Sequence, residues 1–267
     1  MSLSVCATPI GNLDDVTIRV LQELSAADVV LCEDTRRTRG LLARHGVSAR
    51  LLSYHRHNEA RRTAELLPRL ASGDRIALVS DAGLPGINDP GARLVSAALG
   101  EGIPVTVLPG PSAVETALVA SGLVSERYQF LGYLPRGAAE LAALWEELGR
   151  WPWSAVAFES PQRLPGSLAS LAKAWPQREV AVCRELTKRF EEVVRGTAAE
   201  VAPRFVSPPR GEITLVVGAV AESAAVDADA LAAVAELVAA GLGRRRAVAL
   251  IARLTGSPRN ELYRRSL

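Results

Sequence analysis

Three short stretches rich in glycine and proline interrupt apolar runs in the first half of the chain. They cover residues 8–12, 80–91 and 109–113, and the longest of them reads SDAGLPGINDPG. Glycine lets the backbone approach a ligand closely or adopt a positive φ, and proline fixes the shape of a loop. Ligands of open α/β sheets bind beyond the carboxyl ends of the strands. Three such loops at one sheet edge therefore predict a rigid small-molecule site lined largely by backbone atoms.

Several common catalytic motifs are absent from the sequence. No GxGxxG follows a strand pattern and no Walker A lysine loop is present, which disfavours dinucleotide and nucleoside triphosphate binding. The lack of a GxSxG elbow argues against an α/β-hydrolase. His55 and His57 are spaced to share one strand face, but no third ligand is evident, so we expect no metal site.

Length and composition indicate a globular protein of the cytoplasm. A chain of 267 residues with 48% hydrophobic residues is long enough for two domains or one large one. No apolar stretch is long enough for a transmembrane helix, and the amino terminus lacks the pattern of a signal peptide. Cys6, Cys32 and Cys183 are widely spaced in apolar runs, which is typical of core filling in a reducing compartment.

The net charge of +2 is distributed unevenly along the chain. Nine arginines lie between positions 36 and 69, where the opposing acids are Glu59 and Glu65. Residues 241–267 carry seven arginines and one acid, whereas residues 219–240 carry only acidic charges. The planar guanidinium binds phosphate oxygens in pairs and stacks on bases, so these clusters favour a polyanionic partner. The alternative is a solvated surface in an arginine-favouring genome.

The elements that must position the three loops alternate between strand and helix patterns. Apolar runs predict strands over residues 3–7, 29–32, 50–54, 76–79 and 105–108. Helical spacing lies between them, and such repeated strand–loop–helix units imply right-handed crossovers and a mainly parallel sheet.

Helix boundaries in the first half are predicted from capping patterns. Gly46 is expected as the residue that ends one helix, and Asn58 as the cap of another. The Asp89-Pro90 pair is expected to open a helix, with aspartate as the cap and proline in the first turn. Ser112 matches a capping box with the glutamate three residues later, and its backbone can line the site at the same time.

The second half predicts a less regular α/β unit. Strands are expected over residues 129–133, 155–158, 180–183, 190–194 and 213–217, and helices over 138–148 and 164–174.

The proposed division is into three parts. An amino-terminal α/β domain covers residues 1–123, a carboxy-terminal α/β domain covers 124–222, and a small basic helical tail covers 223–267. In the tail, residues 244–254 and 260–265 suggest two short helices around a tight turn, a pattern that permits a helix-turn-helix-like RNA or protein contact.

Eight sequence blocks in consistent order resemble the tetrapyrrole-methylase (class III) family of S-adenosylmethionine-dependent methyltransferases, and among them the branch that 2′-O-methylates a cytidine of 16S rRNA. They are ATPIGNLDDVT (7–17), CEDTRRT (32–38), HRHNE (55–59), LVSDAGLPGINDPG (78–91), LPGPSA (108–113), FESPQR (158–163), CREL (183–186) and GEITLVV (211–217). The ATPIGNL, EDTR and SDAG…NDPG blocks distinguish this branch from the corrin and haem-pathway methylases. One departure is Leu84, where the family loop usually has threonine.

The resemblance implies a two-domain α/β fold of the tetrapyrrole-methylase type, with a cofactor cleft between the domains and a small helical carboxy-terminal extension. It implies S-adenosylmethionine as cofactor, the small ribosomal subunit and its 16S rRNA as substrate, a homodimer, and no membrane. The residues that the resemblance assigns to the cofactor are Pro9, Asp81, Ala82, Gly83, Ile87, Ser112, Ala113, Phe158, Arg184 and Thr214.

Methyl transfer to a ribose hydroxyl requires alignment of three atoms and is helped by a base. The carboxylates nearest the implied pocket in the sequence are Glu33, Asp34 and Glu159, and we favour the region of Asp34. Glu33 and Asp34 alternatively pair with Arg36 or Arg37 to shape the RNA surface.

The same resemblance implies a binding partner for the arginine-rich segment. Its residues would contact rRNA phosphates, with two histidines and an asparagine nearer the target nucleotide. The expected RNA-binding residues are Arg36, Arg37, Arg39, His55, Arg56, His57, Asn58 and Arg163.

Two alternative functions remain open on the sequence alone. A tetrapyrrole C-methyltransferase would share the fold, although a macrocycle needs no long basic track; methyl transfer to a precorrin and not to ribosomal substrates would support it. A non-catalytic RNA-binding or assembly protein is favoured only by Leu84, and titration with S-adenosylmethionine would identify it by the lack of binding.

Overall fold

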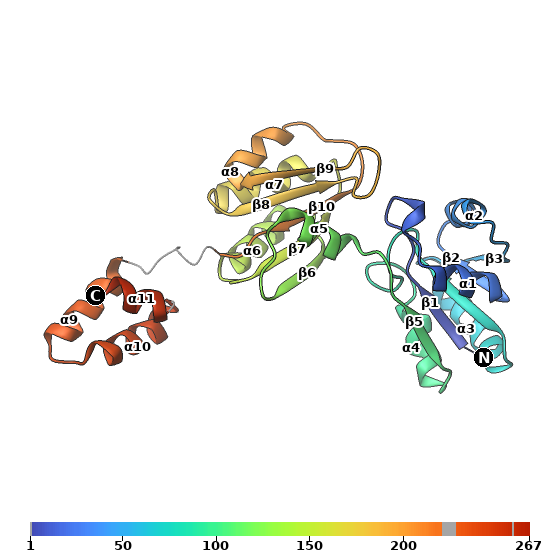
Figure 1. Cartoon of the computed structure of the whole chain (residues 1–267), viewed down its shortest axis with the longest axis horizontal. Helices are drawn as coiled ribbons and strands as arrows, with labels where there is room; N and C mark the ends of the chain where they lie inside the picture. The colour runs from blue at the N-terminus through green and yellow to red at the C-terminus, as the bar shows by residue number, and fades with distance from the viewer. Residues whose placement is uncertain (1, 221–227, 258) are drawn as a thin grey trace.

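The structure is a computed structural model that describes residues 2–220, 228–257 and 259–267. Figure 1 shows two sheet-containing units and a helical tail along the chain. Within the described ranges, no helix combines the length and the apolar character needed to cross a bilayer.

The first unit is built on a five-stranded sheet in the order β3-β2-β4-β1-β5, and every neighbouring pair is parallel. Parallel strands that are covered on both faces need apolar side chains in both directions, as the continuous apolar runs predict. The predicted parallel sheet is therefore confirmed for this unit. Its strands are β1 (Ser2–Cys6), β2 (Val29–Cys32), β3 (Leu51–Ser53), β4 (Arg75–Val79) and β5 (Val105–Leu108).

Helices cover both faces of this sheet. Successive residues of a strand point to opposite faces, so Leu31 joins one apolar core and Val30 the other. The Leu31 core is completed by α3 and α4, and the Val30 core by α1 and α2. These elements are η1 (Leu13–Asp15), α1 (Ile18–Ala26), α2 (Thr35–Arg44), α3 (Glu59–Ala71) and α4 (Ala92–Gly100).

The helix ends agree only in part with the capping patterns. Gly46 follows the last turn of α2 with φ of 65°, as predicted. Asn58 occupies the cap position of α3, but its side chain makes no capping hydrogen bond. The predicted Asp89-Pro90 cap of α4 is wrong, because the cap is Gly91, with φ of 140°. A Cβ at this position would lie 2.8 Å from Leu78 Cδ2, so glycine makes the turn and Asp89 is left in the preceding loop.

The second unit contains a mixed five-stranded sheet in the order β6-β7-β10-β8-β9. Only β6 and β7 are parallel, and the other three pairs are antiparallel. The strand predicted over residues 190–194 begins two residues later than predicted, at the start of β9, because residues 185–191 form a loop that contacts the first unit. The strands are β6 (Tyr128–Tyr133), β7 (Ser154–Glu159), β8 (Glu179–Arg184), β9 (Glu192–Thr197) and β10 (Ile213–Val217).

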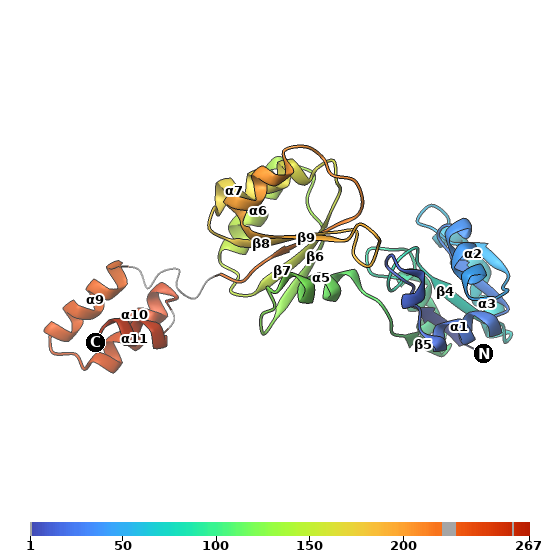
Figure 2. The same cartoon turned by 45° about the horizontal axis from the view of Figure 1, so that its top comes forward.

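Two helical layers sandwich the second sheet, with α5 on one face and α6 and α7 on the other (Figure 2). The fully buried Trp145 of α6 lies in the larger core. On the opposite face, Ala117 and Leu118 of α5 pack against Val156 and Val216. The elements are α5 (Ala113–Ser121), α6 (Ala138–Gly149), α7 (Leu164–Ala174), α8 (Ala198–Val201) and η2 (Ala202–Phe205).

The packing of α5 bears on where the first two units divide. The helix precedes the expected division between residues 123 and 124, yet its buried residues belong to the core of the second sheet. We therefore propose a division in the loop over residues 109–112.

In the described part of the carboxy-terminal tail, three helices share a core of their own: α9 (Ala228–Ala239), α10 (Arg244–Thr255) and α11 (Arg259–Arg265). The last two correspond to the helices expected over residues 244–254 and 260–265. The Ala-rich stretch before them forms α9, whose Val234 packs against Val248 and Leu262. The division expected between residues 222 and 223 lies outside the described residues.

Candidate functional site

The three glycine- and proline-rich loops meet at one edge of the first sheet. Because β1 lies between β4 and β5, the carboxyl ends of these strands are adjacent. Thr8 and Gly83 exchange backbone hydrogen bonds of 2.9 and 3.0 Å, and the Thr8 hydroxyl donates to the Ser80 carbonyl at 3.0 Å. Gly83 has φ of 75°, which a side chain would disfavour. The loops are thus tied into one wall.

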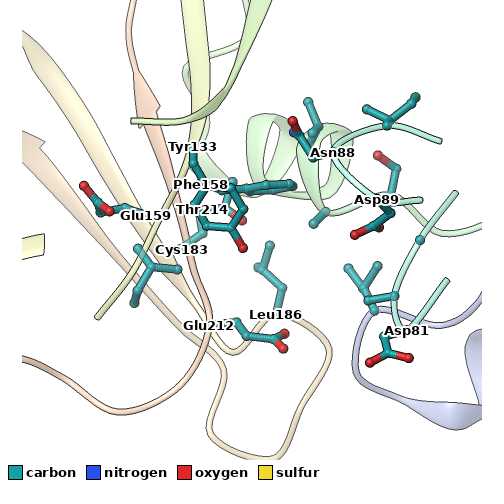
Figure 3. A pocket seen from close by; sticks show the side chains of 18 of the residues that line it. Asp81, Asn88, Asp89, Tyr133, Phe158, Glu159, Cys183, Leu186, Glu212 and Thr214 are labelled. Atoms are coloured by element: carbon teal, nitrogen blue, oxygen red, sulfur yellow. The ribbon is translucent and has the colours of Figure 1, made fainter. Parts of the chain in front are cut away.

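A cavity of about 650 Å³ lies between this wall and the second sheet. In Figure 3, Asp81, Asn88 and Asp89 lie on one side and Tyr133, Phe158 and Thr214 on the other. The size is typical of small-molecule sites.

Most of the residues that we expected at a cofactor line this cavity. They are Asp81, Ala82, Gly83, Ile87, Ser112, Ala113, Phe158 and Thr214. Pro9 and Arg184 do not line it. Pro9 is buried beside the wall, and the Arg184 side chain contacts Glu192 at 2.9 Å and the Arg210 carbonyl at 3.1 Å. Leu84, the departure from the usual loop, also lines the cavity.

An aromatic cluster that the sequence patterns did not identify forms part of the opposite wall. The ring of Phe158 lies edge-on to Phe130 and Tyr133, with centroids 5.0 and 5.6 Å apart. Strand alternation would place Phe130 and Tyr133 on opposite faces. A register shift between them, at Gly132 with φ of 67°, brings both beside Phe158. A glycine inside an aromatic strand was the available signal for this bulge.

The loop that follows β8 in the second unit also contacts the first unit. Thr187 Oγ1 accepts a hydrogen bond of 2.9 Å from the Asn12 N–H, and Ile10 packs against Leu186. A Cβ on Gly11 would lie 2.5 Å from Lys188 Cγ, so only glycine allows this approach. Ile10 and Leu186 both line the cavity, so this contact between the two units forms part of the cavity surface.

Among the described residues, six carboxylates line the cavity and outnumber the one lining arginine, Arg37; they are Glu33, Asp81, Asp89, Glu115, Glu159 and Glu212. An acidic lining of this kind suits a cationic ligand. Of the three expected catalytic carboxylates, Glu33 and Glu159 are in this set and Asp34 is not.

Glu159 is held in an internal network. Its side chain is fully buried, and its oxygens accept hydrogen bonds of 2.6 Å from the Ser160 N–H and the Ser167 hydroxyl. The Arg163 guanidinium forms an ion pair with it and also donates to the carbonyls of Leu134 and Pro135. These contacts occupy both groups, so Arg163 is not part of the RNA surface that we propose below.

Asp34 serves the start of α2. Its carboxylate accepts the Arg36 N–H at 2.8 Å and pairs with the Arg36 guanidinium at 2.7 Å. These hydrogen bonds from Arg36 hold the pKa of Asp34 well below its usual range. Because a carboxylate that resists protonation is a weak base, the geometry favours the alternative that Asp34 shapes the surface.

Ser112 makes a different contact from the one that its pattern predicts. Its hydroxyl donates to the Glu115 carboxylate and makes no capping hydrogen bond to the backbone, so the prediction of a capping box is wrong. Glu115 also accepts a 2.6 Å hydrogen bond from the Tyr128 hydroxyl. Burial raises the pKa of Glu115, but these two hydrogen bonds outweigh it and leave the pKa lowered. Glu115 is therefore a fixed anion at the cavity wall.

The expected RNA-binding residues surround one side of the cavity. Arg37 lines it and lies 3.6 Å from Asp81, while Arg36 and Arg39 are exposed on α2. Arg56 donates to the Asn88 carbonyl of the cavity loop.

The two histidines and Asn58 lie in the turn before α3. The rings of His55 and His57 are 5.9 Å apart, and Asn58 contacts the His55 ring at 3.2 Å and donates to the Ser53 carbonyl. Across the described ranges, no group of three or more His, Cys, Asp or Glu side chains is arranged to hold a metal ion.

Family comparisons match almost the whole chain. The model described as Tetrapyrrole (Corrin/Porphyrin) Methylases matches residues 2–202, and the model described as RsmI C-terminal HTH domain matches residues 224–267.

Two curated relatives from different bacteria share one name. The ribosomal RNA small subunit methyltransferase I of Mesorhizobium japonicum is 42% identical, with 100% of this chain and 91% of the relative covered. The protein of the same name from Thermotoga maritima is 43% identical, with 80% of this chain and 96% of the relative covered.

Solved structures share the fold at low sequence identity. Uroporphyrin-III C-methyl transferase from Thermus thermophilus, complexed with S-adenyl homocysteine, superposes with a TM-score of 0.59 at 18% identity, covering 82% of this chain and 97% of that one. A diphthine synthase structure gives a TM-score of 0.64 at 14% identity, covering 82% and 90%. The predicted tetrapyrrole-methylase fold is confirmed. The chain belongs to the ribosomal RNA small subunit methyltransferase I family of tetrapyrrole methylases.

Proposed function

We propose that this protein transfers a methyl group from S-adenosylmethionine to the ribose 2′-hydroxyl of a cytidine in 16S rRNA of the small ribosomal subunit. The observation that carries the proposal is that Arg37 lines the cavity and lies on the same helix as the exposed Arg36 and Arg39. An RNA strand held by this helix would present its backbone at the cavity.

The lining of the cavity suits the proposed cofactor. The six carboxylates favour a sulfonium cation, the loop around Gly83 offers close backbone contact, and the rings of Phe130 and Phe158 offer an apolar surface for adenine. When bound, S-adenosylmethionine supplies an electrophilic methyl group. The contribution of the protein is to hold the attacking oxygen in line with it and to exclude water.

Ribose methylation can be tested directly in cells. We expect mass mapping of 16S rRNA to show one ribose-methylated cytidine that is lost when the gene is deleted and restored by the wild-type gene. Purified protein with labelled cofactor should methylate small subunits from the deletion strain. An unchanged modification pattern, or label on a base instead of the ribose, would contradict the proposed specificity.

Charge reversal on α2 should weaken RNA binding without disturbing the cofactor. We expect the double variant Arg36→Glu, Arg39→Glu to raise KM for the subunit and to lower the slope of log K against log salt by about one per lost phosphate contact. A control in the second unit, Arg150→Glu after the end of α6 with Arg204→Glu in η2, makes the same charge change at exposed sites. Equal effects of both pairs would show that only net charge matters.

We also propose that the protein acts as a homodimer in the cytoplasm, as the family resemblance implies. Sedimentation equilibrium at micromolar concentration should give twice the 28.3 kDa chain mass. A mass of one chain at these concentrations would contradict the dimer.

A further inference from the structure

The six cavity carboxylates differ in how their oxygens are used. Four of them have hydrogen-bonding or ionic partners. Asp81 accepts the Asp34 N–H and faces Arg37, and Glu115 accepts two hydroxyls. Glu159 is in its buried network, and Glu212 pairs with Lys188 at 2.9 Å. These four are committed to holding the protein together or to fixing the charge of the wall.

Glu33 and Asp89 are the two remaining carboxylates. Neither has a hydrogen bond or ion pair with the part of the chain that the structure describes, and both line the cavity. Their oxygens are therefore open to a ligand in the cavity. Figure 3 shows Asp89 on the cavity side of its loop, facing the wall that carries Tyr133.

The backbone beside Asp89 is held from two directions. Asn88 has φ of 61°, and its carbonyl accepts a hydrogen bond from Arg56. The amide of Asn88 lies against Gly132 of the second unit, where a Cβ would be 3.0 Å from Oδ1. On the other side, Gly91 makes the turn into α4. A residue with positive φ that lies against both units is typical of a functional site.

The surroundings of Asp89 suit a group that exchanges protons near neutral pH. Burial, and then the negative charges of Glu33 and Asp81, raise its pKa to about 6, while Arg56 opposes the shift. Tyr133 faces it from β6. A carboxylate with this pKa is ionised at pH 7.5 yet is a stronger base than an ordinary aspartate.

We propose that Asp89 is the catalytic base that accepts the proton of the attacking RNA hydroxyl; this role rests on the proposed function. The bond between the ribose oxygen and the methyl carbon forms as the bond from that carbon to sulfur breaks, and sulfur keeps the electron pair as a neutral thioether. The hydroxyl proton passes to Asp89 and then to solvent. No further reactant is needed.

The test is the variant Asp89→Asn, which keeps the shape of the side chain and removes its basicity. We expect kcat/KM for small subunits to fall by about 10²- to 10⁴-fold. In the wild-type protein the rate should rise with pH through about 6, because protonated Asp89 cannot accept a proton, and then level off. In Asp89→Asn this rise of the rate with pH should be absent. Calorimetric affinity for S-adenosylmethionine should change by less than tenfold.

A matched variant and a measurement on the free protein complete the test. Glu33→Gln removes the other uncommitted carboxylate and should cause a smaller loss of rate. The rate should still rise with pH, but the rise should move to lower pH because Glu33 no longer raises the pKa of Asp89. Carboxyl carbon NMR of the free wild-type protein should show one aspartate titrating near pH 6 that is missing in Asp89→Asn.

Three outcomes would overturn the proposal. The first is Asp89→Asn activity within threefold of wild type. The second is a rise of the rate with pH that persists in Asp89→Asn and disappears in Glu33→Gln, which would assign the proton to Glu33. The third is a wild-type protein that methylates no small subunit, which would overturn the proposed function itself and with it this role.

Discussion

Replacing Ala113 by tryptophan should weaken S-adenosylmethionine binding by about a hundredfold or more, equivalent to about 2.7 kcal/mol. Ala113 is the first residue of α5 and lines the cavity at the point where the loop from β5 ends. An indole at this position occupies space that the ligand needs, and the melting temperature shows whether the protein accommodates the larger side chain beside its core. Isothermal titration calorimetry with the purified full chain measures the loss.

The control for this substitution lies on the same helix. Val119 is 71% exposed on α5 and does not line the cavity, so Val119→Trp adds the same ring away from the ligand. We expect Val119→Trp to keep wild-type affinity. Wild-type affinity in Ala113→Trp, with an unchanged melting temperature, would place the cofactor elsewhere.

Replacing Glu159 by alanine should lower the free energy of unfolding by about 3–5 kcal/mol, because it leaves the Arg163 guanidinium without its anion. The Glu159 side chain is fully buried and that of Arg163 is 28% exposed, so water compensates for little of the loss. The hydroxyl of Ser167 also loses its acceptor. Urea denaturation followed by tryptophan fluorescence measures the change.

A double variant distinguishes this structural role from a catalytic one. Glu159→Gln with Arg163→Met removes both charges together and should cost less stability than Glu159→Ala alone. If Glu159 is structural, kcat of the folded single variant should stay within tenfold of wild type. A stable Glu159→Ala protein that has lost its activity would return Glu159 to the catalytic candidates.

Sequence patterns located the first wall of the site because local rules were sufficient there. The apolar runs that became β1, β4 and β5 are continuous, as strands buried on both faces require, and glycine and proline mark where each one ends. Once the strands are parallel, their carboxyl ends meet at one edge. The positions of Gly83 and Ser112 at the cavity follow from that topology.

The opposite wall could not be predicted in this way. Phe130 and Tyr133 share a wall only because the bulge at Gly132 shifts the register of β6, and the antiparallel pairing of β10 with β7 brings Thr214 beside Phe158. Strand pairing across 50 or more residues leaves no periodic signal in either segment. The hydrogen bond between Thr187 and Asn12 joins residues 175 positions apart, and it too leaves no signal in the sequence.

The sequence by itself determined the family, the parallel first sheet and the loops that line one side of the cavity, because these depend on residue type and short-range spacing. Only the tertiary structure decided which carboxylates line the cavity and which have partners there. Asp34, Glu159 and Asp89 all carry carboxylates, and the hydrogen bonds and charges that folding places around each one distinguish them. Arg36 pairs with the first, Arg163 and Ser167 hold the second, and the third lines the cavity beside Glu33. A carboxylate acts as a base only where its neighbours leave it free, and those neighbours are brought together by folding.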